Sequence, residues 1–353
     1  MSSGVTRSLL MHLPELIDVQ RIASHGARDL IRVEELATIH HRELSLPLLA
    51  LEFGSQDQTA PVFFLTGGVH GLERIGTRVI ISYLKTLVNL AQWDHSTRDL
   101  LERVRFSVIP IVNPVGMYFG RRSNGNGVDL MRNAPVDAEG ASSISIAAGH
   151  RISNRLPWFR GVLGADMEVE ARALTSYFEQ RFTKAKSVLA LDVHSGFGAV
   201  DRLWFPYART RAPFPNLSEV FRLAHLLDRV YPNHIYKIEP QSASYTTHGD
   251  LWDYLYDRRR ATEGSIFIPL TLELGSWLWI KKNPRQIFSA LGMFNPLLPH
   301  RTSRILRRHL HLLDFLLRAS AAPAAWAMGA GLQRDADDVL RMAKARWYQN
   351  IAA

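Results

Sequence analysis

Short apolar runs recur along the first 275 residues and predict the strands of a sheet. They occupy residues 48–53, 62–65, 106–112, 187–193 and 268–274. Three of these runs, VFFL, VIPIV and VLALDV, are almost unbroken, which is typical of central strands that are covered on both faces. We therefore expect helices above and below the sheet.

Helical spacing appears between these runs. Ile75, Val79 and Leu84 recur at helical intervals within residues 73–90, and a second helix is predicted over residues 167–182. Strands that alternate with helices indicate an α/β fold. We expect a mixed, mostly parallel central sheet with helices on both faces.

Two stretches, residues 134–165 and 205–216, show no period and are rich in small residues or proline. Loops of this length in a compact domain are usually functional, so we expect them to form walls or lids of a site. Helical spacing returns over residues 305–317. We predict one main domain over residues 1–320 and a helical extension over residues 321–353.

The composition of the chain limits the cellular location of the protein and the kinds of catalytic or metal site that it can contain. The chain of 353 residues contains no run of eighteen apolar residues, and its N-terminus lacks the apolar core and cleavage site of a signal peptide. We therefore expect a cytoplasmic protein with no membrane partner. The chain also has no cysteine, which excludes disulfides, thiolate nucleophiles and cysteine zinc sites. Any bound metal must have nitrogen and oxygen ligands, as catalytic zinc does.

The net charge is +9, and much of it lies near the C-terminus. Residues 300–353 carry nine Arg and Lys against four Asp. These charges alternate with apolar positions at helical spacing, which favours a packed amphipathic helix with a solvated basic face. Binding of nucleic acid or another anionic partner is the less favoured alternative. No pattern indicates an oligomeric state.

The first motif with candidate chemistry is TGGVHGLER, residues 66–74, between a predicted strand and a predicted helix. His70 and Glu73 are three residues apart, so both side chains can reach one cation from the same turn. Histidine and glutamate are ligands of catalytic zinc. Alone, the motif also fits a glutamate that merely stabilises a helix start.

The second motif is LALDVHSGFG, residues 189–198, in which a buried strand ends at His194. Ligands bind at the carboxyl edge of such sheets. Asp192 lies two residues earlier on the same face and could hold the imidazole. A structural histidine is the alternative.

The third and fourth motifs supply a carboxylate and several arginines. Glu273 lies within an apolar strand, where a charge is either paired with a cation or kept for chemistry. The glycine-rich run at residues 113–133 carries Arg121, Arg122 and Arg132, which could grip anionic oxygens. A solvated basic turn is the alternative for that run.

Together, the order His-x-x-Glu, arginine loop, His and Glu resembles the zinc carboxypeptidase superfamily. This superfamily includes carboxypeptidase A-like enzymes and the aspartoacylase and succinylglutamate desuccinylase branch. The interval of 124 residues between His70 and His194 is also similar to that of the carboxypeptidases. The resemblance covers about residues 60–280.

The resemblance implies a ligand set and a base. His70, Glu73 and His194 match the ligands of one zinc ion per chain, and Glu273 matches the general base. The implied mechanism is the hydrolysis of an amide bond by a water molecule that zinc activates.

The resemblance also implies roles in substrate binding. Arg122, or less favourably Arg121, matches the arginine that stabilises the oxyanion. Arg132 matches the arginine that binds the terminal carboxylate of a substrate. Tyr245 matches the mobile tyrosine that closes over the C-terminus of a bound peptide.

The sequence departs from the family at Met131, where members usually have an asparagine that assists the arginine matched by Arg132. A thioether cannot donate that hydrogen bond. Either Asn133 compensates through a shifted loop, or recognition of a free carboxylate is weakened. Trp252, which precedes Asp253, matches a position near the base of the side-chain pocket, and a tryptophan there would disfavour basic side chains.

The leading hypothesis is a metallocarboxypeptidase-like hydrolase that acts on a peptide or a peptide-like amide. The alternatives are an N-acyl amino acid amidohydrolase of the desuccinylase type and a catalytically weak binding protein on the same scaffold. Tyr245 and the 79-residue interval between His194 and Glu273 favour the carboxypeptidase.

Overall fold

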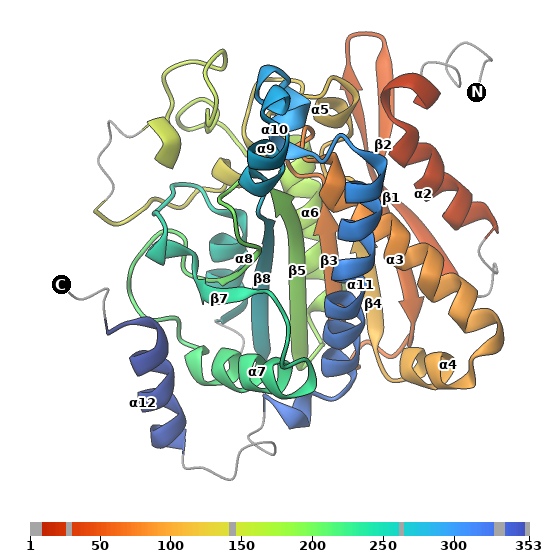
Figure 1. Ribbon diagram of the computed structural model, residues 1–353, viewed down its shortest axis with the longest axis vertical. Helices are drawn as coiled ribbons and strands as arrows, with labels where there is room; N and C mark the ends of the chain where they lie inside the picture. The colour runs from red at the N-terminus through yellow and green to blue at the C-terminus, as the bar shows by residue number, and fades with distance from the viewer. Residues whose placement is uncertain (1–8, 26–29, 141–145, 261–264, 328–335, 350–353) are drawn as a thin grey trace.

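An eight-stranded sheet forms the centre of the protein (Figure 1). The computed structural model describes residues 9–25, 30–140, 146–260, 265–327 and 336–349. The strand order is β1-β2-β4-β3-β5-β8-β6-β7. The strands are β1 (Ile31–His41), β2 (Leu44–Gly54), β3 (Val62–Gly67), β4 (Arg105–Ile109), β5 (Ser187–Ser195), β6 (Arg202–Phe205), β7 (Lys237–Pro240) and β8 (Ile266–Leu274).

The central strands β4, β3, β5 and β8 run parallel to one another. Antiparallel pairs occur towards the two edges, between β1 and β2, between β2 and β4, and between β6 and β8. Because the carboxyl ends of the parallel strands meet at one edge, loops from distant parts of the chain converge there. The prediction of a mixed, mostly parallel sheet is confirmed.

Helices cover both faces of the sheet. Helices α3 (Arg74–Trp93) and α11 (Pro299–Ala321) pack on β3 and β5 from one side, and α6 (Val169–Phe182) and α8 (Leu251–Arg260) lie on the other (Figure 1). The remaining helices are α2 (Pro14–His25), α4 (His95–Glu102), α5 (Pro114–Tyr118), α7 (Leu217–Val230), α9 (Trp277–Lys282), α10 (Ala290–Phe294) and α12 (Ala336–Trp347). Short 3₁₀ helices are η1 (Leu130–Arg132), η2 (Ile146–Ala148), η3 (Gln241–Ala243), η4 (Pro284–Phe288) and η5 (Pro323–Ala325).

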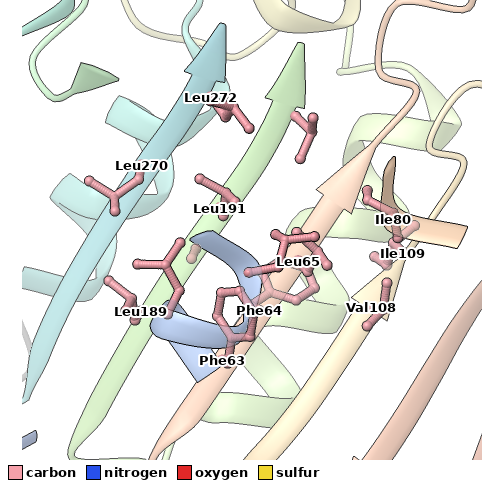
Figure 2. Close-up of a cluster of buried hydrophobic side chains, with 14 of the residues drawn as sticks. Phe63, Phe64, Leu65, Ile80, Val108, Ile109, Leu189, Leu191, Leu270 and Leu272 are labelled. Atoms are coloured by element: carbon pink, nitrogen blue, oxygen red, sulfur yellow. The ribbon is translucent and has the colours of Figure 1, made fainter. Parts of the chain in front are cut away.

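The two-sided cover explains the unbroken apolar runs. Every residue of β3, β4 and β5 is buried, because each strand is packed against helices on both faces. On one side, Phe64 of β3 packs against Phe178 and Phe182 of α6. Figure 2 shows a cluster of buried hydrophobic side chains. The labelled residues are Phe63, Phe64, Leu65, Ile80, Val108, Ile109, Leu189, Leu191, Leu270 and Leu272.

Three strands were not predicted from the sequence. Strand β1 lies at an edge and exposes Glu34 and Glu35, so it has no apolar run. Strands β6 and β7 have four residues each, which is too short for a period to emerge. Their pairing depends on β8 and on each other rather than on local sequence.

The C-terminal residues pack on the rest of the chain through α12. The Trp347 ring lies 4.8 Å from Phe205 and 5.9 Å from Phe221 between centroids, and its indole N–H donates to the carbonyl of Ile238. The division of the chain at residue 320 stays a prediction. Parts of the segments interpreted above, residues 1–8, 141–145, 328–335 and 350–353, lie outside the described residues.

Among the helices of the described residues, none is long and apolar enough to cross a membrane.

Replacement of Trp347 tests how firmly α12 is attached. We expect Trp347→Ala to lower the free energy of unfolding by about 3–5 kcal/mol, because it removes a buried indole and leaves a cavity. Urea unfolding measures this change. The matched control is Trp93→Ala, whose side chain is 71% exposed and which we expect to change stability by less than about 0.5 kcal/mol. Equal effects of the two variants would contradict the prediction.

Candidate metal centre

The turn between β3 and α3 carries His70 and Glu73 to the carboxyl edge of the sheet. Strand β3 ends at Gly67, and Gly68 then adopts a positive φ of 64° that reverses the chain. A side chain at Gly71 would meet the backbone of Gly116 at 2.0 Å. This position must therefore be a glycine for the turn to pack against the backbone of Gly116. Both His70 and Glu73 are buried.

His194 approaches this turn from the neighbouring strand. It lies near the end of β5, directly beside Glu273 of β8 in the parallel register. Its Nδ1 atom is 3.2 Å from Nδ1 of His70 and 3.1 Å from Oε2 of Glu73. Residues that are 124 positions apart in the sequence therefore meet because their strands are adjacent.

Two aspartates fix the tautomers of the histidines. Nε2 of His70 donates to Asp129 at 3.1 Å, and Nε2 of His194 donates to Asp192 at 2.7 Å. Asp192 is itself held by the hydroxyl of Thr66 and the indole N–H of Trp252. In its neutral form each ring therefore keeps its proton on Nε2, and its Nδ1 presents a lone pair to the centre of the site.

With both rings neutral, three acceptors converge at the centre of the site. Ligand atoms of His70, Glu73 and His194 all lie within 4.8 Å of one another, and these residues could hold a metal ion. Although burial opposes the charge, His70 and His194 hold the pKa of Glu73 well below its usual range. Burial likewise opposes a charge on His194, yet Asp192 and Glu73 raise its pKa well above the usual value. The site therefore stabilises positive charge at its centre, and its donor set fits zinc.

An asparagine that directly follows α10 caps the start of helix α3. Glu73 occupies the N-cap position, but its carboxylate faces the histidines and makes no capping bond. The side chain of Asn295 replaces that cap: Oδ1 accepts from the Ile75 N–H at 2.9 Å, and Nδ2 donates to the Leu72 carbonyl at 2.7 Å. The carboxylate of Glu73 is thus free to face the histidines, because Asn295, 220 positions after Ile75, caps the helix in its place.

Glu273 and Arg122 flank the three ligands. Oε1 of Glu273 accepts from the Phe197 N–H at 2.9 Å. Burial raises the pKa of Glu273 to about 8, with a further contribution from the charge of Glu73. Arg122 donates to Asp129 at 2.8 Å and to Glu73 at 3.3 Å, so its guanidinium lies against the ligand cluster.

The three ligand residues, Glu273 and Arg122 all line one cavity of about 600 Å³. Arg132, Met131 and Tyr245 line it as well. The ring of Tyr245 lies between Phe197 and Trp204, with centroids 5.5 and 5.9 Å away. The long loop predicted over residues 134–165 contributes Ala147, Ala148, Pro157 and Trp158 to the wall, and the last of these has a positive φ of 67°.

Three residues singled out in the sequence lie elsewhere. The amide of Asn133 donates to the Arg160 carbonyl and accepts from the Glu168 N–H, so it is committed to the scaffold. Arg121 is exposed, and its guanidinium lies over the Phe119 ring. The expectation that Trp252 shapes the side-chain pocket is wrong, because its indole points to Asp192.

Three further residues at the site had no role assigned from the sequence. Asp129 lies within the arginine loop, between Arg122 and Arg132, and could have been found as a carboxylate partner for a ligating histidine. Asp250, at the start of α8, lines the cavity. Asn295 has no local sequence signal, because its partners lie on a distant turn.

Three protein ligands of nitrogen and oxygen type beside a cavity are characteristic of catalytic rather than structural zinc sites. A family model described as zinc carboxypeptidase matches residues 30–277, and the chain belongs to this family. The resemblance inferred from the four motifs is thus confirmed.

Two curated relatives are carboxypeptidases. Carboxypeptidase SOL1 of Arabidopsis thaliana is 24% identical over 121 residues, which cover 33% of this chain and 25% of the relative. Carboxypeptidase E of Caenorhabditis elegans is 32% identical over 106 residues, which cover 25% of this chain and 22% of the relative. The chain therefore spans about a quarter of the length of these relatives.

Solved structures share the fold. Thrombin activatable fibrinolysis inhibitor matches with a TM-score of 0.63 and 18% identity, over 86% of this chain and 72% of that chain. Carboxypeptidase A from Helicoverpa armigera matches with a TM-score of 0.62 and 21% identity, over 87% and 72%. At these identities the likeness shows the fold alone.

Replacement of Asp192 tests whether it orients His194 for a metal. We expect Asp192→Asn to weaken zinc binding by about 10- to 100-fold, because the ring loses its charged acceptor. Competition between the metal-free protein and a fluorescent chelator measures the dissociation constant. Asp166→Asn, at an exposed position, is the control. An unchanged dissociation constant in a folded Asp192→Asn protein would exclude this role.

Proposed function

We propose that the protein is a zinc-dependent hydrolase of the metallocarboxypeptidase type that cleaves peptide bonds near a free C-terminus. One observation carries the proposal: the three metal-ligand residues and the carboxylate of Glu273 face the same cavity. Family membership supports it, since the matched family is that of the zinc carboxypeptidases.

His70, Glu73 and His194 would hold the zinc ion, and Glu273 would act as general base. When bound, zinc polarises a carbonyl and makes a water molecule more acidic. A raised pKa makes the carboxylate of Glu273 a stronger base, suited to remove the proton from the attacking water and return it to the leaving amine. The Phe197 N–H keeps one carboxylate oxygen in place during this transfer.

Arg122, Arg132 and Tyr245 would bind the substrate. Arg122 lies against the ligand cluster, where a guanidinium can stabilise negative charge that develops on the carbonyl oxygen. Arg132 lines the same cavity, and its Nε atom is buried without a hydrogen-bond partner among the described residues. A substrate carboxylate would satisfy this donor. Met131 beside it supplies only an apolar contact.

The N-acyl amino acid amidohydrolase is not favoured, because the family model and the curated relatives are carboxypeptidases. The same matches give no support to a binding protein without activity. The cytoplasmic location inferred from the sequence stays a prediction.

Replacement of Glu273 tests the mechanism. We expect Glu273→Gln to lower kcat by about 10²–10⁴-fold on peptides with a free C-terminus, while the bound zinc remains. Initial rates and metal analysis of the same preparation measure both quantities. His194→Ala is the comparison, since it should lose the metal as well as the activity. A Glu273→Gln protein with unchanged kcat would refute the mechanism, and release of acyl groups instead of C-terminal residues would favour the amidohydrolase.

Asp250 is a candidate for the residue that selects the side chain of the substrate. It is buried in the cavity wall, and its Oδ1 caps α8 by accepting from the N–H groups of Trp252 and Asp253. Among the described residues, its Oδ2 has no hydrogen-bond partner. Burial raises the pKa of Asp250 although the charge of Arg132 lowers it in part, and a further cation nearby would stabilise the charged form. We propose that the cavity prefers substrates with a cationic side chain.

Asp250→Asn tests this preference without removing the helix cap, because asparagine keeps the accepting Oδ1. We expect kcat/KM for peptides ending in Lys or Arg to fall by about 10- to 100-fold, from the loss of a hydrogen bond to a charged group. Peptides ending in Leu serve as the internal control and should change little. An equal loss on both kinds of peptide would rule out a role in specificity.

A further inference from the structure

A long basic segment of the chain has no part in the proposed reaction. Residues 275–313 contain no Asp or Glu, and they carry Lys281, Lys282, Arg285, Arg301, Arg304, Arg307 and Arg308. This segment comprises α9, η4, α10 and the first half of α11, and the family match ends at residue 277. The family match therefore leaves most of this segment uncovered.

Four of these cations line a cavity of about 390 Å³ between α9, α11 and residues 199–201. They are Lys282, Arg301, Arg304 and Arg308. Asp201 is the single carboxylate in the wall, and it lies 3.5 Å from Arg308. Lys282 and Arg304 form no ion pair within the described part of the chain. The cavity thus has an excess of positive charge that suits a phosphate group.

The same segment exposes bulky apolar side chains. Trp277 is 56% exposed, Ile287 is 54% exposed and Phe288 is 91% exposed, and Leu278 lines the cavity itself. Lys281 and Arg285 are exposed in the same segment. Exposed tryptophan, phenylalanine and aliphatic side chains interleaved with lysine and arginine are typical of surfaces that rest in the headgroup region of a bilayer.

We propose that this surface, formed by α9, η4 and the N-terminal half of α11, docks on a bilayer that contains anionic phospholipids. Trp277, Ile287 and Phe288 enter the interface, and a headgroup phosphate binds between Lys282 and Arg304. Trp277 and Phe288 could stack on bases as well, but the exposed Leu278 and Ile287 could not, and aliphatic side chains of this kind favour a membrane over nucleic acid. The expectation of no membrane partner rested on the lack of a long apolar run, which surface docking does not require.

Docking in this way would bring the large cavity close to the lipid surface. Ala290, Met293 and Phe294 of the same segment line that cavity. The Trp277 ring lies 6.1 Å from Phe197, whose N–H holds Glu273. The arrangement is independent of hydrolysis, so binding can be tested whether or not the proposed activity is correct.

The test is flotation of the full chain with two kinds of vesicle, pure phosphatidylcholine and an equal mixture of phosphatidylcholine and phosphatidylserine. We expect binding to the mixed vesicles alone. Lys282→Gln with Arg304→Gln should lower the partition coefficient by about 30-fold, since each cation near an anionic surface contributes about fivefold. Ile287→Ser with Phe288→Ser should also lower it. These side chains are exposed, so folding should be preserved, and thermal unfolding checks this.

The matched control neutralises Lys184 and Lys186, two exposed lysines that precede β5 at the opposite edge of the sheet. Lys184→Gln with Lys186→Gln gives the same net charge as the first pair and should bind vesicles normally. If both double variants lost vesicle binding equally, the effect would come from net charge alone. That result would overturn the proposed docking site. Binding to glycerophosphoserine or to an oligonucleotide without any binding to vesicles would overturn the bilayer as the partner.

Discussion

The structure is organised around an electrostatic requirement: three lone-pair acceptors that face one another need a shared cation. Asp129 and Asp192 impose this requirement, because each accepts a hydrogen bond from the Nε2–H group of one histidine. The Nδ1 atom of each neutral ring is then left without a proton. Neighbouring acceptors at such short range would repel one another in a buried site. The affinity of the centre for a metal therefore depends on the two aspartates as well as on the ligands themselves.

The sheet supplies the precision that such a centre needs. His194 and Glu273 are register partners on adjacent strands, and Thr66 on the other side of β5 holds Asp192. These positions are fixed by backbone hydrogen bonds within a packed core, so they tolerate little displacement. The arginines and Tyr245, in contrast, come from loops or short helices, where variation in length and sequence can alter the substrate without disturbing the metal.

The sequence allowed prediction of the parts that depend on local pattern. The central strands are unbroken apolar runs, and the ligand residues directly follow or end them, so both could be placed. The loops could not be placed, because a small rotation changes which side chain faces the cavity. Helix α8 is capped by Asp250 and turns Trp252 towards Asp192, and the scaffold contacts of Asn133 draw it out of the site. Edge strand β1 was missed because its exposed face is charged.

The cap provided by Asn295 has a consequence for the order in which the protein matures. All three ligand residues and Glu273 precede Asn295 in the chain. Helix α3, which begins beside Glu73, gains its cap only from Asn295. During synthesis on the ribosome, the ligand set is complete about a hundred residues before this support emerges. The start of helix α3, beside Glu73, is therefore capped only once most of the polypeptide has been made.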